Sequence, residues 1–365
     1  MDWRQWDRIQ EKIESGRRLS AEEGLFLFDP AVSVHRVGQL ADRVCQRRHG
    51  RGVYYVQNAH LNPTNVCVLR CPICAYSRSA GDPDAFTMSE QEVLAQAQEA
   101  VEAGCTELHI VGGLHPEKPY PWYRDLLQVV HESFPRVHLK AWTAVEIAWF
   151  AELTGWPIRA VLEDLMEVGL GSLPGGGAEI FAPQVRQQIS PKKIDAETWL
   201  AVHREAHRLG LRSNATMLYG HLETAADRID HLVRLRQLQD ETGGFLAFVP
   251  LAFHPGKTQF FHLPGPTGLD DLRVMAVSRL MLDNIPHMKA YWISLGVGTA
   301  QTALAYGAND MEGTVRQERI HHEAGSSAPQ ALSVEEICLL IRQAGRLPIQ
   351  RDSLYRPIAS AGAPS

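Results

Sequence analysis

Hydrophobic and polar positions follow two alternating periods along the middle of the chain. From residue 53 onward, short apolar runs of strand type are each followed by a segment whose apolar residues recur at helical spacing. We predict strands over residues 53–61, 108–111, 137–142, 170–173, 212–218, 245–250, 289–295 and 308–314. We predict helices between them over residues 89–104, 122–134, 158–168, 196–209, 224–239, 270–283 and 299–304.

This succession of about eight strand–helix units without hairpins predicts an α/β fold with a parallel sheet. The length fits a (βα)₈ TIM barrel, which takes about 250 residues, and an open doubly wound sheet is the alternative. We expect a helical cap over residues 1–50, a barrel over 51–320, and a helical extension with a loose tail over 321–365. Val34, Val37, Leu40 and Val44 form a helical stripe in the cap, and residues 351–365 are rich in Ala, Ser, Pro and Gly.

Net charge and the length of the apolar runs argue against two classes of partner, nucleic acids and membranes. The 365 residues carry a net charge of −6, which argues against a nucleic-acid partner because such proteins need a basic surface. The apolar runs are far shorter than the roughly 20 residues that span a bilayer, so we expect no membrane partner. The first residues contain no apolar segment of signal-peptide type, and we expect a cytoplasmic protein.

The strongest chemical signal is a cluster of cysteines directly after the first predicted strand. Cys67, Cys71 and Cys74 lie within eight residues, whereas Cys45, Cys105 and Cys338 are scattered and are interpreted as small core residues. Three thiolates suit a [4Fe–4S] cluster that keeps one iron open to another ligand. The alternatives are a zinc site, with His60 or His115 as fourth ligand, and three reduced thiols in a loop.

The Cys-x₃-Cys-x₂-Cys spacing after a barrel strand resembles the radical S-adenosylmethionine (SAM) enzymes. This resemblance implies that SAM chelates the open iron, and that one electron from the cluster cleaves it to methionine and a 5′-deoxyadenosyl radical. Tyr76 matches an aromatic position near the adenine. Gly112 and Gly113 end the second strand, where glycines admit a ligand close to the backbone, and the resemblance implies contact with the methionyl amino group. The glycine-rich segment after the strand at 170–173 adds Gly176 and Glu179 as further expected SAM contacts.

Polar residues at the other strand ends are the remaining candidates, because barrel active sites lie at the carboxyl ends of the strands. We predict catalytic roles for His115, Lys140 and His221, and substrate binding by Arg78, Asn214, Tyr219 and His254.

A closer resemblance covers roughly residues 50–325. The blocks at residues 110–116, 140–147, 172–180, 215–221 and 251–255 resemble those of the aminofutalosine (aminodeoxyfutalosine) synthases of the futalosine route to menaquinone. Two related families, the cyclic dehypoxanthinylfutalosine synthases and the deazaflavin (FO) synthases, share several blocks. Val111 and the Thr143–Ile147 block favour the aminofutalosine synthases over these relatives.

The resemblance implies an unusual transferase reaction. The adenosyl radical would add to the alkene of 3-[(1-carboxyvinyl)oxy]benzoate, and rearrangement with loss of a carboxylate would give 6-amino-6-deoxyfutalosine. SAM would then be a consumed co-substrate, and a protein such as flavodoxin or ferredoxin would supply reducing electrons. A cyclase that abstracts hydrogen from a nucleoside remains an alternative, as does a non-catalytic iron–sulfur or zinc scaffold, which would leave the glycine elements unexplained.

Overall fold

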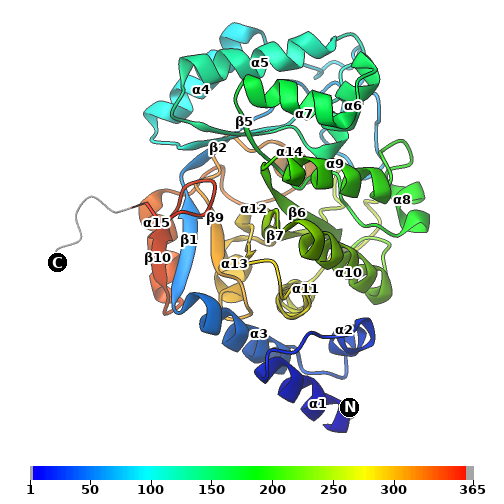
Figure 1. The fold of residues 1–365 in the computed structure, drawn as a ribbon, viewed down its shortest axis with the longest axis vertical. Coiled ribbons are helices and arrows are strands. Elements are labelled where there is room, and N and C mark those ends of the chain that lie inside the picture. Colours follow the sequence, from blue (N-terminus) through cyan, green and yellow to red (C-terminus); the bar gives the residue numbers. More distant parts are fainter. Residues whose placement is uncertain (1–2, 359–365) are drawn as a thin grey trace, which may run out of the picture.

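The computed structural model describes residues 3–358, and their elements alternate between helices and strands (Figure 1). The helices are α1 (Trp3–Glu14), α2 (Ala21–Phe28), α3 (Val34–His49), α4 (Glu90–Glu102), α5 (Tyr120–Ser133), α6 (Ala144–Thr154), α7 (Ile158–Glu167), α8 (Pro183–Ile189), α9 (Ala196–Arg208), α10 (Ala225–Thr242), α11 (Gly268–Met281), α12 (Trp292–Leu295), α13 (Val297–Ala303), α14 (Ile320–Ala324) and α15 (Val334–Gln343). The strands are β1 (Gly52–Val56), β2 (Asn58–Leu61), β3 (Glu107–Ile110), β4 (His138–Ala141), β5 (Leu170–Leu173), β6 (Arg212–Tyr219), β7 (Phe245–Ala252), β8 (His287–Met288), β9 (Asp310–Gly313) and β10 (Leu347–Gln350).

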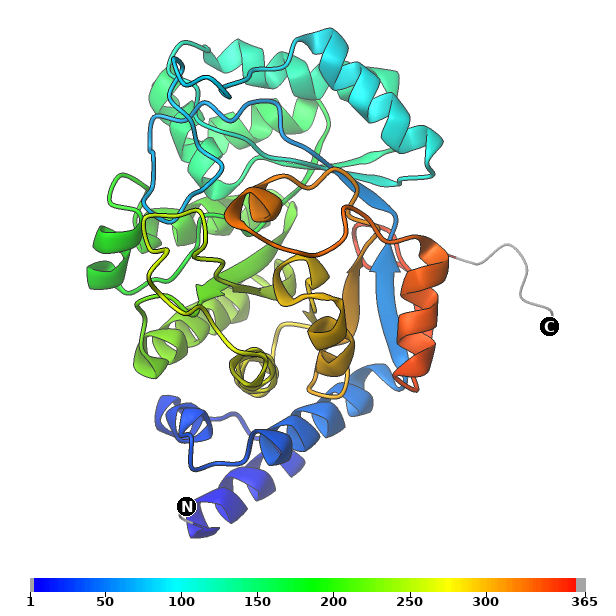
Figure 2. The same ribbon diagram turned by 180° about the vertical axis from the view of Figure 1, so that it is seen from behind.

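Seven parallel strands form one curled sheet in the order β2-β3-β4-β5-β6-β7-β8. The helices between successive strands cover its outer face, as Figures 1 and 2 show from opposite sides. Spatial order follows chain order without a reversal, whereas a doubly wound sheet reverses at a switch point. The predicted α/β barrel-type fold is therefore confirmed, and the doubly wound alternative is wrong.

The segment around β9 connects the two edges of this curled sheet. Lys289, just after β8, forms a parallel bridge with Asp310, and Ala59 of β2 forms one with Arg316. Backbone hydrogen bonds from Ala290 to Asp310 and from His60 to Arg316, both 2.8 Å long, support these bridges. The segment after β8 and the segment around β9 thus bridge the gap between β8 and β2.

The predicted strand over residues 53–61 is in fact two strands in different sheets. β1 pairs with β10 and β9 in a separate three-stranded sheet, whereas β2 begins the curled sheet. The prediction at 289–295 was also wrong in part, because β8 ends at Met288 and residues 292–295 form the short helix α12. Helices α6 and α8 were not predicted.

The amino-terminal helices pack under the barrel through the expected stripe. Val34, Val37, Leu40 and Val44 of α3 are buried, and α3 lies against α11 while α2 lies against α10 and α11 (Figure 1). Ser20 with Glu23 forms a capping box at the start of α2, which fixes the first turn of that helix. Within residues 3–358 we find no helix with the length and apolar character needed to cross a lipid bilayer.

The expected loose tail is wrong for the part of it that the structure describes. Arg351 is fully buried, and its Nε donates to Asp310 Oδ2 at 2.7 Å. Tyr355 stacks on His287 with ring centroids 3.8 Å apart. Residues 359–365 lie outside the described residues, and the division into cap, barrel and extension stays a prediction.

Candidate functional site

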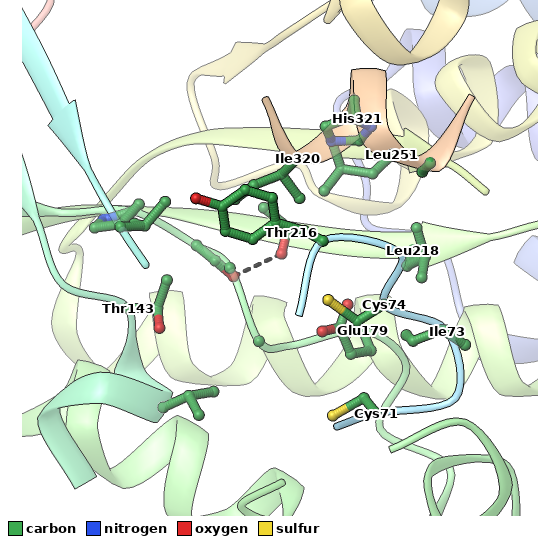
Figure 3. Close-up of a pocket in the computed structure, with 18 of the residues that line it drawn as sticks. Cys71, Ile73, Cys74, Thr143, Glu179, Thr216, Leu218, Leu251, Ile320 and His321 are labelled. Atoms are coloured by element: carbon green, nitrogen blue, oxygen red, sulfur yellow. Dashed lines mark hydrogen bonds between the residues drawn. The ribbon is translucent and has the colours of Figure 1, made fainter. Parts of the chain in front are cut away.

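A cavity of about 330 Å³ lies inside the curled sheet and extends to the carboxyl ends of its strands. Its lining combines side chains from strand interiors, such as His60 and His109, with loops that follow the strands. Figure 3 shows Cys71, Cys74 and Glu179 in one part of this cavity and His321 with Leu251 in another. The site therefore lies where a barrel fold places its chemistry.

The predicted cysteine cluster lines this cavity. Cys67, Cys71 and Cys74 lie on the long loop between β2 and α4, and all three are free thiols. Backbone hydrogen bonds fix the loop, from Cys67 N to the Arg78 oxygen and from Cys74 N to the Cys71 oxygen, both at 2.9 Å. Burial raises the pKa of the Cys71 thiol to about 11, so this thiol ionises readily only when a cationic partner joins it.

The cysteine loop fits an iron–sulfur cluster better than a single metal ion. In the described residues, no group of three or more Cys, His, Asp or Glu side chains is placed around a single metal ion position, as a tetrahedral zinc site requires. In a cubane, by contrast, each thiolate binds a different iron, so three thiols facing one cavity are sufficient. Cys45, Cys105 and Cys338 are buried elsewhere, as predicted for core residues.

Gly112 and Gly113 line the same cavity and allow the end of β3 to lie against the cysteine loop. A Cβ atom on Gly113 would lie 2.1 Å from the Val66 carbonyl oxygen. Gly113 N also donates to the Thr64 oxygen at 2.9 Å. Close packing of two backbones thus explains Gly113 directly, and contact with SAM stays a prediction.

Glu146, in the first turn of α6, connects this glycine pair by hydrogen bonds to Thr143, which follows the next strand, β4. Its carboxylate accepts hydrogen bonds from Gly112 N at 2.9 Å and from Thr143 N at 2.6 Å. Burial raises the pKa of the Glu146 carboxyl to about 7, against these two hydrogen bonds, which lower it. The Glu146 carboxyl lines the cavity. Because its pKa lies near 7, it is able to exchange a proton near physiological pH.

The second glycine segment closes the cavity from the β5 side. The Gly175 carbonyl accepts a hydrogen bond from the Thr216 hydroxyl at 2.6 Å, which Figure 3 shows as a dashed line from Thr216. Gly176 lines the cavity beside Thr143. Glu179 has a left-handed backbone with φ 45°, which is uncommon for a residue with a side chain.

Glu179 forms a buried ion pair with Lys193, whose Nζ lies 2.5 Å from Glu179 Oε1. Burial raises the pKa of the Glu179 carboxyl, but the charge and hydrogen bond of Lys193, together with the Arg186 charge, outweigh burial and hold that pKa below its usual range. Lys193 also interacts electrostatically with Cys71 and Cys74. The ammonium thus supplies positive charge next to thiols that must become thiolates.

Of the other residues predicted to be catalytic or to bind SAM or substrate, only some line the cavity. Tyr76, Asn214 and His254 line it, and their binding roles stay predictions. Arg78, His115, Lys140, Tyr219 and His221 are not among the residues that line it. The lining of this cavity gives no support to the catalytic roles predicted for His115, Lys140 and His221 or to the substrate binding predicted for Arg78 and Tyr219, and these roles stay predictions.

Each of these five side chains contacts a residue that does not line the cavity. Arg78 pairs with Asp84 at 2.7 Å, and Lys140 forms an ion pair of the same length with Glu107 in the barrel interior. The Tyr219 hydroxyl donates to Asp271 at 2.7 Å.

Both histidines of this group satisfy backbone amides. The His115 Nδ1 accepts from Glu117 N at 3.1 Å, and the His221 Nδ1 accepts from Leu222 N at 2.7 Å. These contacts shape the loops that follow β3 and β6.

Several polar residues of the cavity were missed as candidates. They are His109, Lys193, Lys289, Tyr291, Glu312, Glu318 and His321, whereas His60 was considered only as a possible zinc ligand and Glu146 only as part of a sequence block. His60 and His109 each stand one residue before the end of a strand, a position that the alternation of faces identifies as inward. The Glu318-x-x-His321-His322 spacing was also visible in the sequence, whereas nothing local marks Lys193.

Two protein families match successive parts of the chain. Residues 61–235 match the Radical SAM superfamily, and residues 242–362 match the family described as the CofH/MqnC C-terminal region. The first match spans the cysteine loop and strands β3 to β6, and the second spans strands β7 to β10.

Full-length relatives carry two different names. The chain is 47% identical to an aminodeoxyfutalosine synthase of Thermus thermophilus, over 96% of this chain and 95% of that protein. It is 41% identical to an aminodeoxyfutalosine synthase of Streptomyces coelicolor, over 95% and 92%. It is also 40% identical to a 5-amino-6-(D-ribitylamino)uracil–L-tyrosine 4-hydroxyphenyl transferase of Methanopyrus kandleri, over 95% and 94%.

Solved structures agree on the fold. Methylornithine synthase (PylB) superposes with a TM-score of 0.75 at 16% identity, covering 93% of this chain and 97% of that one. The hydrogenase maturase HydG gives a TM-score of 0.74 at 18% identity, over 95% and 76%. The chain therefore belongs to the radical SAM enzymes, which use a [4Fe–4S] cluster and SAM, and within them to the group that includes the aminodeoxyfutalosine synthases.

Proposed function

We propose that this enzyme joins the adenosyl moiety of SAM to 3-[(1-carboxyvinyl)oxy]benzoate and so forms 6-amino-6-deoxyfutalosine for menaquinone synthesis. The observation that carries the proposal is the near full-length similarity, at 47% and 41% identity, to two proteins named for this product. Methionine and the carbon dioxide or bicarbonate from one carboxylate would be the other products.

Cys67, Cys71 and Cys74 would hold the cluster, and SAM would bind between the cysteine loop and the two glycine segments. The bound cluster and SAM supply a 5′-deoxyadenosyl radical. The rest of the site positions the substrate and excludes water, and positioning is the main contribution that such a reaction requires. Leu218, Val249, Leu251 and Ile320 provide apolar lining of the kind that suits an aromatic substrate.

Helix α14 contributes to closure of the cavity. Ile320 and His321 line it, and the Arg319 guanidinium stacks over the Phe86 ring at 5.1 Å from the ring centre. Glu323 lies 3.7 Å from Arg78, which follows the cysteines. These contacts connect α14 to the cysteine loop and support a role in keeping water from the reacting groups.

A second candidate is the tyrosine-dependent transferase reaction named for the archaeal relatives. The match over residues 242–362 to the CofH/MqnC C-terminal region and the 40% identity to the Methanopyrus kandleri protein favour it. The two candidates differ in their acceptors, since one is a dicarboxylate and the other is a uracil derivative that acts with L-tyrosine.

The experiment is an anaerobic assay of the reconstituted enzyme with SAM labelled in the adenine. Flavodoxin, ferredoxin or a chemical reductant would serve as electron donor. With 3-[(1-carboxyvinyl)oxy]benzoate, we expect the label in a benzoate-containing adduct and little free 5′-deoxyadenosine. The proposal fails if no adduct forms while L-tyrosine and the ribitylaminouracil are consumed, or if label emerges only as 5′-deoxyadenosine. The Cys71→Ala variant is the negative control.

A further inference from the structure

The Lys193 ammonium is a buried positive charge on the wall of the cavity that the cysteines line. Among the described residues of this lining, Lys193 and Lys289 are the two with an ammonium or guanidinium group. Lys289, just after β8, pairs with Glu312 of β9 at 2.6 Å. Lys193 interacts electrostatically with Cys71 and Cys74, and its side chain is 15% exposed. Lys193 is therefore the cation of the lining that acts on the cysteine loop.

Backbone contacts bring the segment that contains Lys193 to the cysteine loop. Ile73, which lies between two of the cysteines, donates its N–H to the Ile189 oxygen at the end of α8, with an N···O distance of 3.4 Å. Four residues further along the chain, Lys193 N donates to the Ser190 oxygen at 3.0 Å. The chain after α8 thus turns beside the cysteine loop and places the lysine there.

The partner of this lysine faces the cysteines as well. Lys193 Nζ lies 2.5 Å from Glu179 Oε1, and the Glu179 side chain is 14% exposed. Figure 3 shows the Glu179 carboxylate in the same part of the cavity as Cys71 and Cys74. Two opposite buried charges therefore lie next to the thiols.

A second buried cation, Arg186 of α8, holds this ion pair in place without lining the cavity. Its guanidinium donates to the Ala178 and Ile180 oxygens, which flank the glutamate of the pair. It also donates to the Ile194 oxygen, which follows the lysine of the pair. Because one guanidinium joins both segments, the fold fixes the position of the two charges.

Reduction of a cluster bound here would add an electron to a group that three thiolates already make anionic. Neighbouring charges change the free energy of such a step most where burial keeps water and salt from screening them. A cation beside the cluster stabilises the reduced state more than the oxidised state, whereas an anion does the opposite. Net charge is accordingly one of the properties that set the potential of an iron–sulfur cluster.

We propose that Lys193 and Glu179 set the reduction potential of the cluster that the three cysteines hold. The Lys193 ammonium raises the potential, and the Glu179 carboxylate lowers it. One electron passes from a reduced donor, such as flavodoxin, ferredoxin or a chemical reductant, to the oxidised cluster, and Lys193 makes this transfer more favourable. This role is common to both candidate functions, because each reaction begins with reduction of the cluster, whichever acceptor follows.

The test is a redox titration of the reconstituted enzyme without SAM, in which electron paramagnetic resonance measures the reduced cluster at each potential. For Lys193→Met we expect the ratio of reduced to oxidised cluster at a fixed potential to fall by about tenfold, a shift of about 59 mV to more negative values for a one-electron couple. Glu179→Gln should shift the potential to more positive values, and the double variant should lie between the two single variants. Lys193→Arg retains the charge and should stay near the wild type.

The adjacent lysine provides a matched control. Lys192 is exposed, so solvent screens its charge, and Lys192→Met should leave the potential unchanged. All variants are compared at equal iron content. An unchanged potential in Lys193→Met, or shifts of the same sign in Lys193→Met and Glu179→Gln, would overturn the inference.

A second variant decides the matter if Lys193→Met does not hold the cluster. A positive shift in Glu179→Gln would then support the inference, and a negative shift or none would overturn it. The product assay with the benzoate substrate tests the proposed function separately, since the potential is measured without SAM or any acceptor.

Discussion

A Cβ atom added to Gly113 would lie 2.1 Å from the carbonyl oxygen of Val66, the residue that precedes Cys67. The atom that would be hit belongs to the backbone, so it cannot move aside as the end of a flexible side chain can. The position of the cysteine loop therefore depends on the absence of a side chain at Gly113.

Replacing Gly113 by Ala should displace the cysteine loop. We expect a loss of about 1–3 kcal/mol in the free energy of unfolding, because overpacking forces backbone shifts, and a clear fall in iron bound after anaerobic reconstitution. Gly298→Ala is the matched control, since an added Cβ there meets nothing within 4 Å. Normal iron content and stability in Gly113→Ala would show that the backbones separate without cost.

The Tyr219 hydroxyl should stabilise the fold and leave substrate affinity unaffected. Tyr219→Phe removes its 2.7 Å hydrogen bond to Asp271 and leaves a buried carboxylate oxygen without this donor. We expect a loss of about 1–3 kcal/mol in unfolding free energy with an unchanged KM. Asn214→Ala, at a cavity-lining residue, is the comparison and should raise KM. A raised KM without destabilisation in Tyr219→Phe would restore the substrate role expected from the sequence.

The buried ion pair between Arg351 and Asp310 should make the carboxyl-terminal segment essential for stability. Both side chains are inaccessible to solvent, so Arg351→Met leaves an uncompensated buried carboxylate. We expect a loss of about 3–5 kcal/mol in chemical denaturation. The exposed pair of Arg17 and Glu11 is the control, and Arg17→Met should cost less than about 1 kcal/mol. Equal effects of the two substitutions would contradict this prediction.

The pair of Glu318 and His322 should stabilise the protein within a defined pH window. The hydrogen bond to Glu318 raises the pKa of His322 from 6.5 to about 9, so its contribution is complete below pH 6.5 and is lost as pH rises through about 9. Burial raises the pKa of Glu318, but the His322 hydrogen bond together with the contributions of His321 and His60 outweighs burial and lowers that pKa from 4.5 to about 2. The contribution of Glu318 is therefore present above pH 4.5 and is lost as pH falls through about 2.

His322→Gln should accordingly destabilise the protein most between pH 4.5 and 6.5, by about 1 kcal/mol. The measurement is the difference in urea-unfolding free energy between variant and wild type at pH 5.5 and at pH 9.5. The difference should shrink at the higher pH, where His322 is neutral. A difference that grows toward pH 9.5 would show that the pair does not carry this charge.

Local patterns in the sequence were sufficient for much of the fold. The helical stripe of α3 and most of the strand–helix alternation depend on residues close in sequence, and the structure has them as predicted. The cysteine spacing likewise identified the loop that lines the cavity, because all three ligands lie on one short segment.

Tertiary structure decided which other side chains meet. Tyr219 and His221 stand at a strand end, as a substrate-binding residue would, yet their partners are Asp271 and the backbone of Leu222. Lys193 follows no recognisable pattern, but folding places it beside Glu179 and the cysteines. The break at Gln57 between β1 and β2 also depends on distant segments, because β10 and β9 pair with β1 and not with β2.

The physical reason for this division is the range over which each interaction acts. Capping, periodic burial and ligand spacing involve residues a few positions apart, so one segment of sequence contains all of their determinants. The hydrogen bond of Tyr219 to Asp271 and the ion pair of Lys140 and Glu107 join residues 52 and 33 positions apart, so they result from packing between separate segments, where burial makes each polar contact costly to leave unmade. The sequence by itself determined the barrel-type fold and the cysteine loop, and only the tertiary structure decided which polar groups face the cavity.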